Sequence, residues 1–486
     1  MFALALAAVL APAVAIVLIG ITRRARLAEF LNLAAAVVSF AVSVPLVVLL
    51  AHTGARVFVD QAVLIDPLEA WVQLCTTLVY LLASIYAVGY MRHIGEDDEL
   101  PLFYALFAGF GLTMLIAPMM NKPGLYWIAI EATTLVSTFC VCFERAAESI
   151  EAAWKYIIVV SAGLSLALLG TALFYWNGTF VLGQRYVMTW ATLAHIAPHL
   201  HPNLAILAFL LVLVGFGTKV GLAPMHTWLP DAHSEGPAPV SAMLSGALLN
   251  TAMVGIVRYL AIADAAGIGA ISHAFLIALG AFSLFVAALF IVRQDGVKRL
   301  MAYSTVEHMG VIALGFGFGG PFGVAGALYQ MLNHSAAKSL MFFGAGNAMR
   351  SYGTKKMREI FRFSEHFPVT GALWLAGAVA ITGAPPFGLF QSEFSILRAG
   401  FAVGNIAPVL IMLVLLIVIF VGFINHFRVM FYEKPRAIAE RRLTQPAAWC
   451  VVPMALALAP VVVLGFWWPE RIWHFFGAVA ETLGGA

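Results

Sequence analysis

Long apolar stretches separated by short polar connections recur along most of this chain of 486 residues. An α-helix needs about 20 such residues to cross the apolar core of a bilayer, which is roughly 30 Å thick. Because the stretches are predominantly apolar, we predict an all-α, polytopic membrane protein. The fourteen predicted spans cover residues 2–22, 29–51, 68–91, 102–119, 123–143, 151–176, 204–224, 238–262, 271–293, 297–318, 322–346, 370–398, 405–432 and 449–469.

The distribution of basic residues predicts the orientation of these spans, because connections on the cytoplasmic side of a membrane are enriched in Lys and Arg. The first span has no basic residue before it, whereas Arg23, Arg24 and Arg26 follow it directly. We therefore expect a retained helix with its N-terminus outside, and not a cleaved signal peptide. When later spans alternate from this start, most basic residues of the connections lie inside. Both termini then lie outside, in a bacterial-type inner (cytoplasmic) membrane.

Composition supports a membrane protein and argues against other classes. Hydrophobic residues make up 62% and charged residues 10% of the chain, against roughly 45–50% and 25% in soluble domains. Its four cysteines include no CxxC pair, so no iron–sulfur or haem site is expected. GFGTKVG superficially resembles a phosphate-binding loop, but it lies inside an apolar span. No segment of the chain looks like a soluble domain that could hold a nucleotide. We expect no cofactor in this chain and no nucleic-acid partner.

Two of the predicted spans are interrupted by proline and glycine. Residues 204–224 run into GLAPMH, and residues 370–398 contain ITGAPPFG. Each is fourth in a run of five spans, and two consecutive runs of five cross the membrane in opposite directions. Paired broken helices in inverted repeats are typical of the ion path of a transporter. The predicted units are N-terminal helices (1–101), a first repeat (102–262), a second repeat (271–432), and a cytoplasmic loop with the last helix (433–486).

One lysine and one glutamate lie deep inside two spans of the first repeat. Lys219 precedes the break in the seventh span, and Glu131, in YWIAIEATTL, lies near the middle of the fifth. A charge at the centre of a membrane helix costs at least about 2.5–3.5 kcal/mol, so it needs a partner or a function. We predict a buried pair that water can switch between charged and neutral states, which suits proton transfer. The alternative is a structural role, as a permanent ion pair or as a lysine bound by carbonyls of the broken helix.

The eleventh span carries a polar stripe. Gln330, His334 and Lys338, in LYQMLNHSAAKSLMF, recur every four residues, which places them on one face of a helix. A stripe that includes an imidazole titrating near neutral pH suits a proton relay. The alternative is a hydrogen-bonded stripe that only joins helices.

Further ionisable residues lie in the tenth and twelfth spans. Glu307 and His308 are adjacent, so they diverge by about 100° around their helix, and we expect at most one of them to line a given path. Each is as consistent with a relay as with a structural role in the core. Glu393 follows the break in the twelfth span, at a place like that of Lys219. We predict an exit-side proton carrier there, with a structural partner for a basic residue as the alternative.

The remaining ionisable residues are weaker candidates. Lys155, near the inner end of the sixth span, could reach the interface by snorkelling, and Arg258 is expected to do so at the opposite end of its helix. A polar loop after the first break is predicted to line an inlet. Because such turns more often cap helices than bind metal, no metal site is predicted there. The loop residues are His226, Asp231, His233 and Glu235.

Several long segments carry a recognisable pattern. They are GFGTKVGLAPMHTWLPDAHSEGPAPVSAMLSGALLNTAMVGIVRY, VKRLMAYSTVEHMG and LNHSAAKSLMFFGAGN, with SIYAVGYMRH, IEATTL and EAAWKYII in support. Over about residues 68–432 the chain resembles the antiporter-like subunits of respiratory Complex I and the Mrp-type antiporters. Within that family it is most similar to the hydrogenase-4 component F branch, from the membrane arm of group 4 nickel–iron hydrogenases and formate hydrogenlyases.

This resemblance implies roles for individual residues. Glu131 and Lys219 match the charged pair of the family's fifth and seventh helices. His334 and Lys338 match its central polar axis, and Glu393 matches the terminal acid of chain-4-like members.

One position departs from the family pattern. Chain-4 proteins usually carry a lysine in the LLKTA segment of the eighth helix, where this chain has Asn250. A relay from Lys219 through this position would have to use water or the amide.

We therefore predict a proton-translocating, antiporter-like subunit of a membrane-bound oxidoreductase complex of the group 4 hydrogenase kind. Protons would enter from the cytoplasm at the seventh helix, load Lys219, pass along His334, Lys338 and His308, and leave near Glu393. Redox chemistry would belong to partners, namely a nickel–iron hydrogenase arm and other membrane-arm subunits. Three alternatives stay open: a Complex I or Mrp subunit that also moves Na⁺, the membrane subunit of an inorganic-carbon uptake complex with a zinc-carrying partner, and a non-conducting scaffold.

Overall fold

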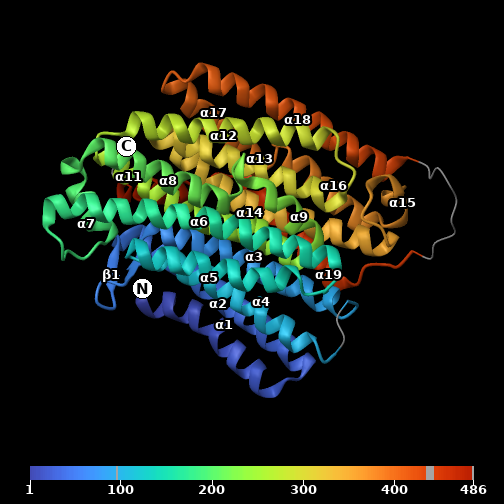
Figure 1. Cartoon of the computed structure of the whole chain (residues 1–486). Helices are drawn as coiled ribbons and strands as arrows, with labels where there is room; N and C mark the ends of the chain where they lie inside the picture. The colour runs from blue at the N-terminus through green and yellow to red at the C-terminus, as the bar shows by residue number, and fades with distance from the viewer. Residues whose placement is uncertain (95–96, 434–442, 484–486) are drawn as a thin grey trace.

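Long apolar helices packed side by side form the molecule (Figure 1). The computed structural model describes residues 1–94, 97–433 and 443–483. Within these residues, 11 helical segments are long and apolar enough to span a bilayer. They are α1 (Phe2–Thr22), α2 (Ala25–Thr53), α3 (Pro67–Met91), α4 (Leu100–Ile116) with the 3-10 turn Ala117–Met119, α5 (Pro123–Val141), α6 (Ala147–Leu182), α8 with α9 (Pro202–Val220, Trp228–Glu235), α10 with α11 (Ala238–Met243, Leu249–Ala265), α12 (Gly269–Val292), α18 (Ile406–Tyr432) and α19 (Ala448–Phe466).

The other three predicted spans form the polar helices α13 (Val297–Phe318) and α14 (Gly320–Tyr352) and the pair of short helices α16 (Pro368–Ile381) and α17 (Gly388–Ala402). Every residue of α13 except Arg299 is buried. Helices enclosed by protein can carry polar side chains that lipid would exclude. The predicted all-α membrane fold is confirmed, and its polar helices lie inside a sheath of apolar ones.

The seventh span is broken where the sequence predicts. α8 ends at Val220 because Gly221 adopts a left-handed conformation (φ 82°) that favours glycine. A 3-10 turn (Met225–Thr227) then leads into α9. The Ala223 N–H, freed by the break, donates to Ser283 Oγ of α12 at 2.9 Å. The predicted polar loop after the break is wrong, because Asp231, His233 and Glu235 belong to the helix α9 and His226 belongs to the 3-10 turn before it.

The twelfth span is interrupted in the same manner between α16 and α17. Gly383 has a φ of 68°, and Pro385 and Pro386 follow it, so helical hydrogen bonding stops. In Figure 1, α8 lies toward the end that carries α7 (Trp190–Ile196), and α9 lies toward the end that carries α15 (Phe363–His366). The order is reversed for α16 and α17. The two broken helices thus run in opposite directions, as inverted repeats require.

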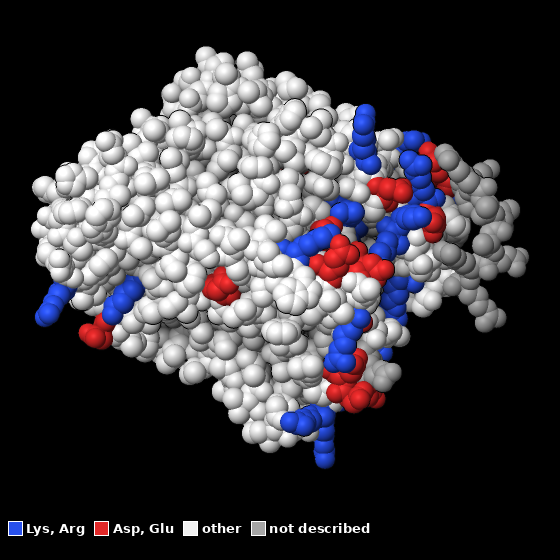
Figure 2. Space-filling model, in the orientation of Figure 1, with Lys and Arg blue, Asp and Glu red and all other residues white. Residues whose placement is uncertain are grey.

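The two ends of the bundle differ in charge. One end, the hairpin face, carries α7, α20 (Glu470–Thr482) and the antiparallel pair β1 (Arg56–Phe58) and β2 (Val63–Ile65), none of which was predicted (Figure 1). The opposite end, the basic face, carries the connections after α1, α3, α5, α12 and α14. Figure 2 shows Lys, Arg, Asp and Glu crowded at the basic face. Residues 434–442 of the predicted cytoplasmic loop lie outside the described residues.

Small residues allow α6 and α8 to approach closely, as at many helix contacts in membranes. A Cβ on Gly215 of α8 would lie 2.4 Å from the Ala167 N and 2.7 Å from the Gly163 O of α6. Because backbone atoms cannot yield as a flexible side chain can, Gly215→Ala is expected to lower the free energy of unfolding by about 1–3 kcal/mol. Thermal unfolding of the purified protein measures this loss.

The matched control for this substitution is Gly477→Ala. Gly477 lies on the exposed side of α20, and an added Cβ there meets nothing within 4 Å. Equal melting temperatures for the two variants would contradict the tight packing of α6 on α8.

Candidate functional site

Lys219 occupies the last turn of α8, immediately before the break, and is fully buried. Its Nζ donates to Thr134 Oγ1 of α5 at 2.9 Å and to the Tyr156 hydroxyl of α6 at 2.7 Å. The ammonium also lies 5.0 Å from the centroid of the Tyr156 ring, within range of a cation–π interaction. The C-terminal end of a helix favours a cation. Neutral hydroxyls and a helix end therefore hold this charge, which leaves it able to exchange a proton.

Glu131 lies one turn before Thr134 on α5. Its Oε1 accepts a hydrogen bond from Ser161 Oγ of α6 at 2.6 Å, and its Oε2 is buried with no hydrogen-bond partner in the described part of the chain. Within residues 97–433, no hydrogen bond or ion pair joins Glu131 to Lys219. The two members of the predicted pair therefore bind different hydroxyl groups of α5 and α6, and the unbonded carboxylate oxygen of Glu131 can still accept a proton.

Polar groups of the two halves meet at a π-helical turn (Leu244–Leu248) between α10 and α11. π turns often mark functional sites. Asn250 Nδ2 lies within donor distance of Ser335 Oγ (3.1 Å), Gly246 O (3.3 Å) and Met331 O (3.4 Å). Its Oδ1 is buried without a partner. Within residues 97–433, the groups around the Asn250 amide thus provide three hydrogen-bond acceptors and no donor.

Asn250→Lys should be well tolerated, because an ammonium has three N–H donors and no acceptor and so matches this set of oxygens. We expect normal assembly and proton transfer at least as fast as in the wild type. Asn250→Leu keeps a similar size but donates nothing, so transfer should slow about threefold, with water bridging part of the gap. The rate of proton uptake during turnover in vesicles measures both effects.

Asn425→Leu is the control for this pair, since Asn425 lies exposed on the outer helix α18. If the lysine variant failed to assemble while the leucine variant worked normally, Asn250 would not lie on the path.

The buried polar and ionisable groups form a line, the central line, which starts at Lys219 and Asn250. Its second half lies between α13 and α14. Lys338 Nζ donates to Met301 O of α13 at 3.1 Å, and His334 Nε2 lies 3.2 Å from Ser245 O of the π turn. The rings of His334 and His308 meet edge to face, with their centroids 5.2 Å apart. The predicted stripe of α14 therefore joins the π turn to α13 through fully buried groups.

Gln330 connects this stripe to Glu393 beyond the second break. Its Nε2 lies 3.0 Å from His308 Nδ1 and 3.5 Å from Glu393 Oε1, and its Oε1 accepts a hydrogen bond from Ser392 Oγ. Glu393 is 6% exposed and borders a cavity of about 340 Å³ between α17 and α18. A Cβ on Gly383 would come within 2.0 Å of Glu393 Oε2, so this glycine makes room for the carboxylate. Glu393 thus lies where the buried line reaches a cavity.

Glu307 and His308 point to different partners, as their adjacency on α13 requires. Both are buried. His308 contacts Gln330 and His334, whereas Glu307 lies within electrostatic range of Lys338 and keeps one carboxylate oxygen without a hydrogen-bond partner.

The four polar residues after the first break do not gather. Asp231 pairs with Arg299 (2.6 Å) and Lys155 (3.3 Å), and Glu235 pairs with Lys355 (2.5 Å), all toward the basic face. His233 stacks on Phe342, and His226 lies edge-on to Tyr303. In the described part of the chain, no group of three or more His, Cys, Asp or Glu residues is placed to hold a metal ion.

One buried lysine was missed by the sequence analysis. Lys298 lies in the first turn of α13, at the edge of the predicted tenth span, where a basic residue does not stand out. It is 4% exposed, and its Nζ donates to Gly236 O at 2.5 Å, at the end of α9. A cavity of about 290 Å³ at the basic face is lined by Lys298, Glu144 and Glu235. This cavity borders the basic-face end of α9, the second half of the broken seventh helix.

Arg258 does not snorkel, contrary to the prediction. Its guanidinium is 6% exposed and forms an ion pair with the fully buried Asp66, with 2.8 Å between Nη2 and Oδ2. Asp66 caps the N-terminus of α3 and neutralises the charge of Arg258. The two residues are far apart in the sequence, so the sequence alone did not predict this pair.

Buried ionisable side chains along the middle of a membrane-spanning bundle, beside two broken helices, are features of ion-transporting membrane proteins. The chain belongs to the NADH:quinone oxidoreductase/Mrp antiporter family, whose transmembrane model matches residues 124–419. It is thus an antiporter-like membrane subunit, and the resemblance drawn from its motifs is confirmed.

Individual relatives agree with this assignment. The chain is 37% identical over 345 residues to a hydrogenase-4 component F homolog of Methylacidiphilum infernorum, covering 70% of this chain and 72% of that protein. Its fold matches a chain of the archaeal membrane-bound sulfane sulfur reductase with a TM-score of 0.88 at 21% identity, covering 99% of this chain and 97% of that one. A chain of the Mrp complex from Dietzia sp. DQ12-45-1b also gives 0.88, at 19% identity, with 100% and 98% covered. At these identities, the two structures show the fold alone.

Proposed function

We propose that this chain moves protons across the membrane as a subunit of a redox complex of the group 4 nickel–iron hydrogenase kind. The observation that carries the proposal is the buried line of ionisable and polar groups that runs from Lys219 to Glu393 through the centre of the bundle. The similarity to a hydrogenase-4 component F homolog supports this choice of complex.

The proposed path begins at the basic face, which we take to be cytoplasmic from its charge. The cavity beside Lys298 admits water to the broken seventh helix, where Lys219 takes up a proton. The proton passes the hydroxyls of α5 and α6 and the amide of Asn250 to reach Lys338. It then follows the contacts of α14 to the cavity at Glu393, on the second broken helix.

The driving step is a change in the electrostatic environment of a few buried groups. Moving an opposite charge toward or away from a buried ammonium shifts its proton affinity, and each tenfold change corresponds to about 1.4 kcal/mol. Glu131 is placed to do this, because its carboxylate is one turn from a hydroxyl that binds Lys219 and has one oxygen free. The electron transfer that powers such changes is proposed to occur in partner subunits.

The test is to purify the complex from its native membrane through a tag on this chain and to identify its partners by mass spectrometry. We expect a nickel–iron arm and other membrane-arm subunits. The complex is then placed in liposomes, and proton movement is recorded during turnover in sodium-free buffer. Movement that required Na⁺ would replace the proton with sodium as the transported ion. A complex that turned over without moving either ion would overturn the proposal.

A further inference from the structure

Glu69 is a buried acid that the proposed path does not use. It lies in the first turn of α3, is 0% exposed, and neither of its carboxylate oxygens has a hydrogen-bond partner among the residues that the structure describes. Its backbone N–H donates to Asp66 Oδ1 at 2.8 Å, which fixes the start of the helix. Burying a carboxylate without a hydrogen-bond partner costs free energy, unless an internal water binds it or a proton neutralises it.

An ion pair separates Glu69 from the hairpin face. Asp66 and Arg258 are joined at 2.8 Å with side chains 0% and 6% exposed, and the guanidinium lies 5.6 Å from the Trp190 ring centroid. All three residues line a cavity of about 300 Å³. The exposed residues Ala194 and Glu481 also line it, so it reaches the surface. The pair thus stands between a surface cavity and the buried acid.

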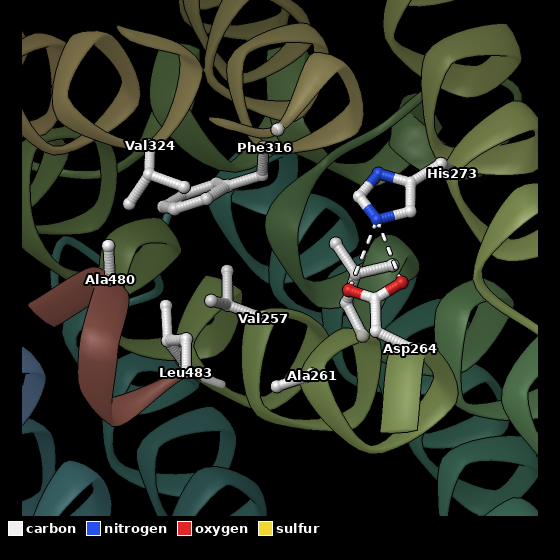
Figure 3. Close-up of a pocket in the computed structure, with 10 residues that line it drawn as sticks. Val257, Ala261, Asp264, His273, Phe316, Val324, Ala480 and Leu483 are labelled. Atoms are coloured by element: carbon white, nitrogen blue, oxygen red, sulfur yellow. Dashed lines mark hydrogen bonds and ion pairs between the residues drawn. The ribbon is translucent and has the colours of Figure 1, made fainter. Parts of the chain in front are cut away.

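A second cavity at the same end offers no comparable path. Figure 3 shows it lined mainly by apolar side chains such as Val257, Phe316 and Val324, and its volume is only about 30 Å³. Asp264, at its edge, turns toward His273 and is held there at 3.0 Å. Of these two cavities, the one at Asp66 is the one that borders the ion pair next to Glu69.

Polar side chains continue inward from Glu69 on the same face of α3. Gln73 and Thr76 follow at four and seven residues, which places them beneath it on the helix. Both are 0% exposed, and all of their side-chain polar atoms are without partners within the described residues. Buried polar groups without protein partners are commonly satisfied by internal water. The stripe therefore has the chemistry of a water-filled passage.

The inner end of this stripe reaches the polar groups between the two halves. Cys75, next to Thr76, lies beside Ser335 of α14, whose Oγ is 3.1 Å from Asn250 Nδ2. Asn250 and Arg258 lie eight residues apart on one face of α11, a rise of about 12 Å, and Glu69 and Thr76 are separated by about 10 Å along α3. The stripe thus spans the distance from the surface ion pair to the centre of the proposed path.

We propose that Glu69 carries protons through a second outlet, which leaves the central line near Asn250 and follows Thr76 and Gln73 to the cavity at Asp66 and Arg258. The inference rests on the proposed proton-moving function. In the transfer step, a water in the stripe that has received a proton from the central line passes it to the Glu69 carboxylate and becomes neutral again. The carboxyl group then releases the proton to water in the cavity when the Asp66–Arg258 pair opens. No electron moves in this step.

The experiment measures protons moved per electron by the complete complex in liposomes. Glu69→Gln keeps the size of the side chain but removes the exchangeable proton, and closing one of two outlets is expected to lower the ratio about twofold. Ala194→Trp, which fills the cavity without touching Glu69, should have a similar effect. The electron-transfer rate should fall by no larger a factor than the number of protons moved per electron. Glu470→Gln, an exposed acid on α20, should match the wild type.

The outcomes separate the two proposals. A wild-type complex that moves no protons removes the proposed function, and the second outlet with it, before any variant is compared. A wild type that moves protons, with Glu69→Gln at the same ratio, overturns the second outlet alone. If Glu69→Gln does not assemble, Ala194→Trp decides, and a wild-type ratio in that variant overturns the outlet.

Discussion

Lys219→Met is expected to lower redox-driven proton movement by at least about tenfold, which corresponds to about 1.4 kcal/mol in the barrier, without loss of stability. Methionine fills a similar volume but can neither hold nor pass on a proton. The hydroxyls that bind the ammonium keep other partners, because Tyr156 still contacts Ser137 at 2.7 Å and Thr134 can still reach Ile130 O at 3.5 Å. Replacing a buried charge by an apolar residue of similar size is often neutral or stabilising.

The measurement pairs proton uptake in liposomes with thermal unfolding of the same preparation. Lys356→Met is the control, because Lys356 is an exposed lysine in the connection after α14. A variant at position 219 that melted normally and moved protons at the wild-type rate would support the scaffold alternative. Loss of assembly together with loss of transfer would instead assign Lys219 a structural role.

The features predictable from the sequence are those that break an apolar pattern. Lys219 and Glu131 stood out because charges deep in membrane helices are rare and costly. The glycines and prolines at both breaks gave the positions where α8 and α16 end. Four-residue spacing placed Gln330, His334 and Lys338 on one face of a helix. The structure adds the residues of α13, α17 and the π turn that this face contacts.

The features that the sequence did not reveal follow no such pattern. Tyr156 and Ser161, which bind Lys219 and Glu131, look like ordinary residues of an apolar helix, because single hydroxyls are common there. Arg258 and Lys298 lie near helix ends, where snorkelling or a loop is the usual expectation, and only the packing of distant segments shows that both are buried. Residues 228–235 were too polar to predict as a helix within the bundle.

The acid at the start of α3 illustrates the same limit. A glutamate in the first turn of a helix is common, since it complements the helix dipole. Only the fold shows that Glu69 is enclosed, without hydrogen-bond partners, between the Asp66–Arg258 pair and the polar groups around Asn250.

Removing both outlets should have an effect as large as removing Lys219. Gln330→Leu cuts the link between His308 and Glu393, so on its own it should lower the protons moved per electron about twofold. Combined with Glu69→Gln, it should lower proton movement by at least about tenfold, because no buried polar route to the hairpin face then remains in the proposed scheme. The same liposome assay compares the single and double variants.

The stability of Gln330→Leu distinguishes it from Lys219→Met. Within the described residues His308 Nε2 already lacks a hydrogen-bond partner, and losing Gln330 leaves Nδ1 unbonded too, so the free energy of unfolding should fall by about 1–3 kcal/mol. Gln391→Leu is the control, since Gln391 is only half-buried and makes a long contact of 3.4 Å with Gly465 O. If Gln330→Leu alone already gave the full loss of proton movement, Glu393 would be the sole outlet. If the double variant still moved protons at half the wild-type ratio, neither branch would carry the main flux, and the exit would lie elsewhere beyond Lys338.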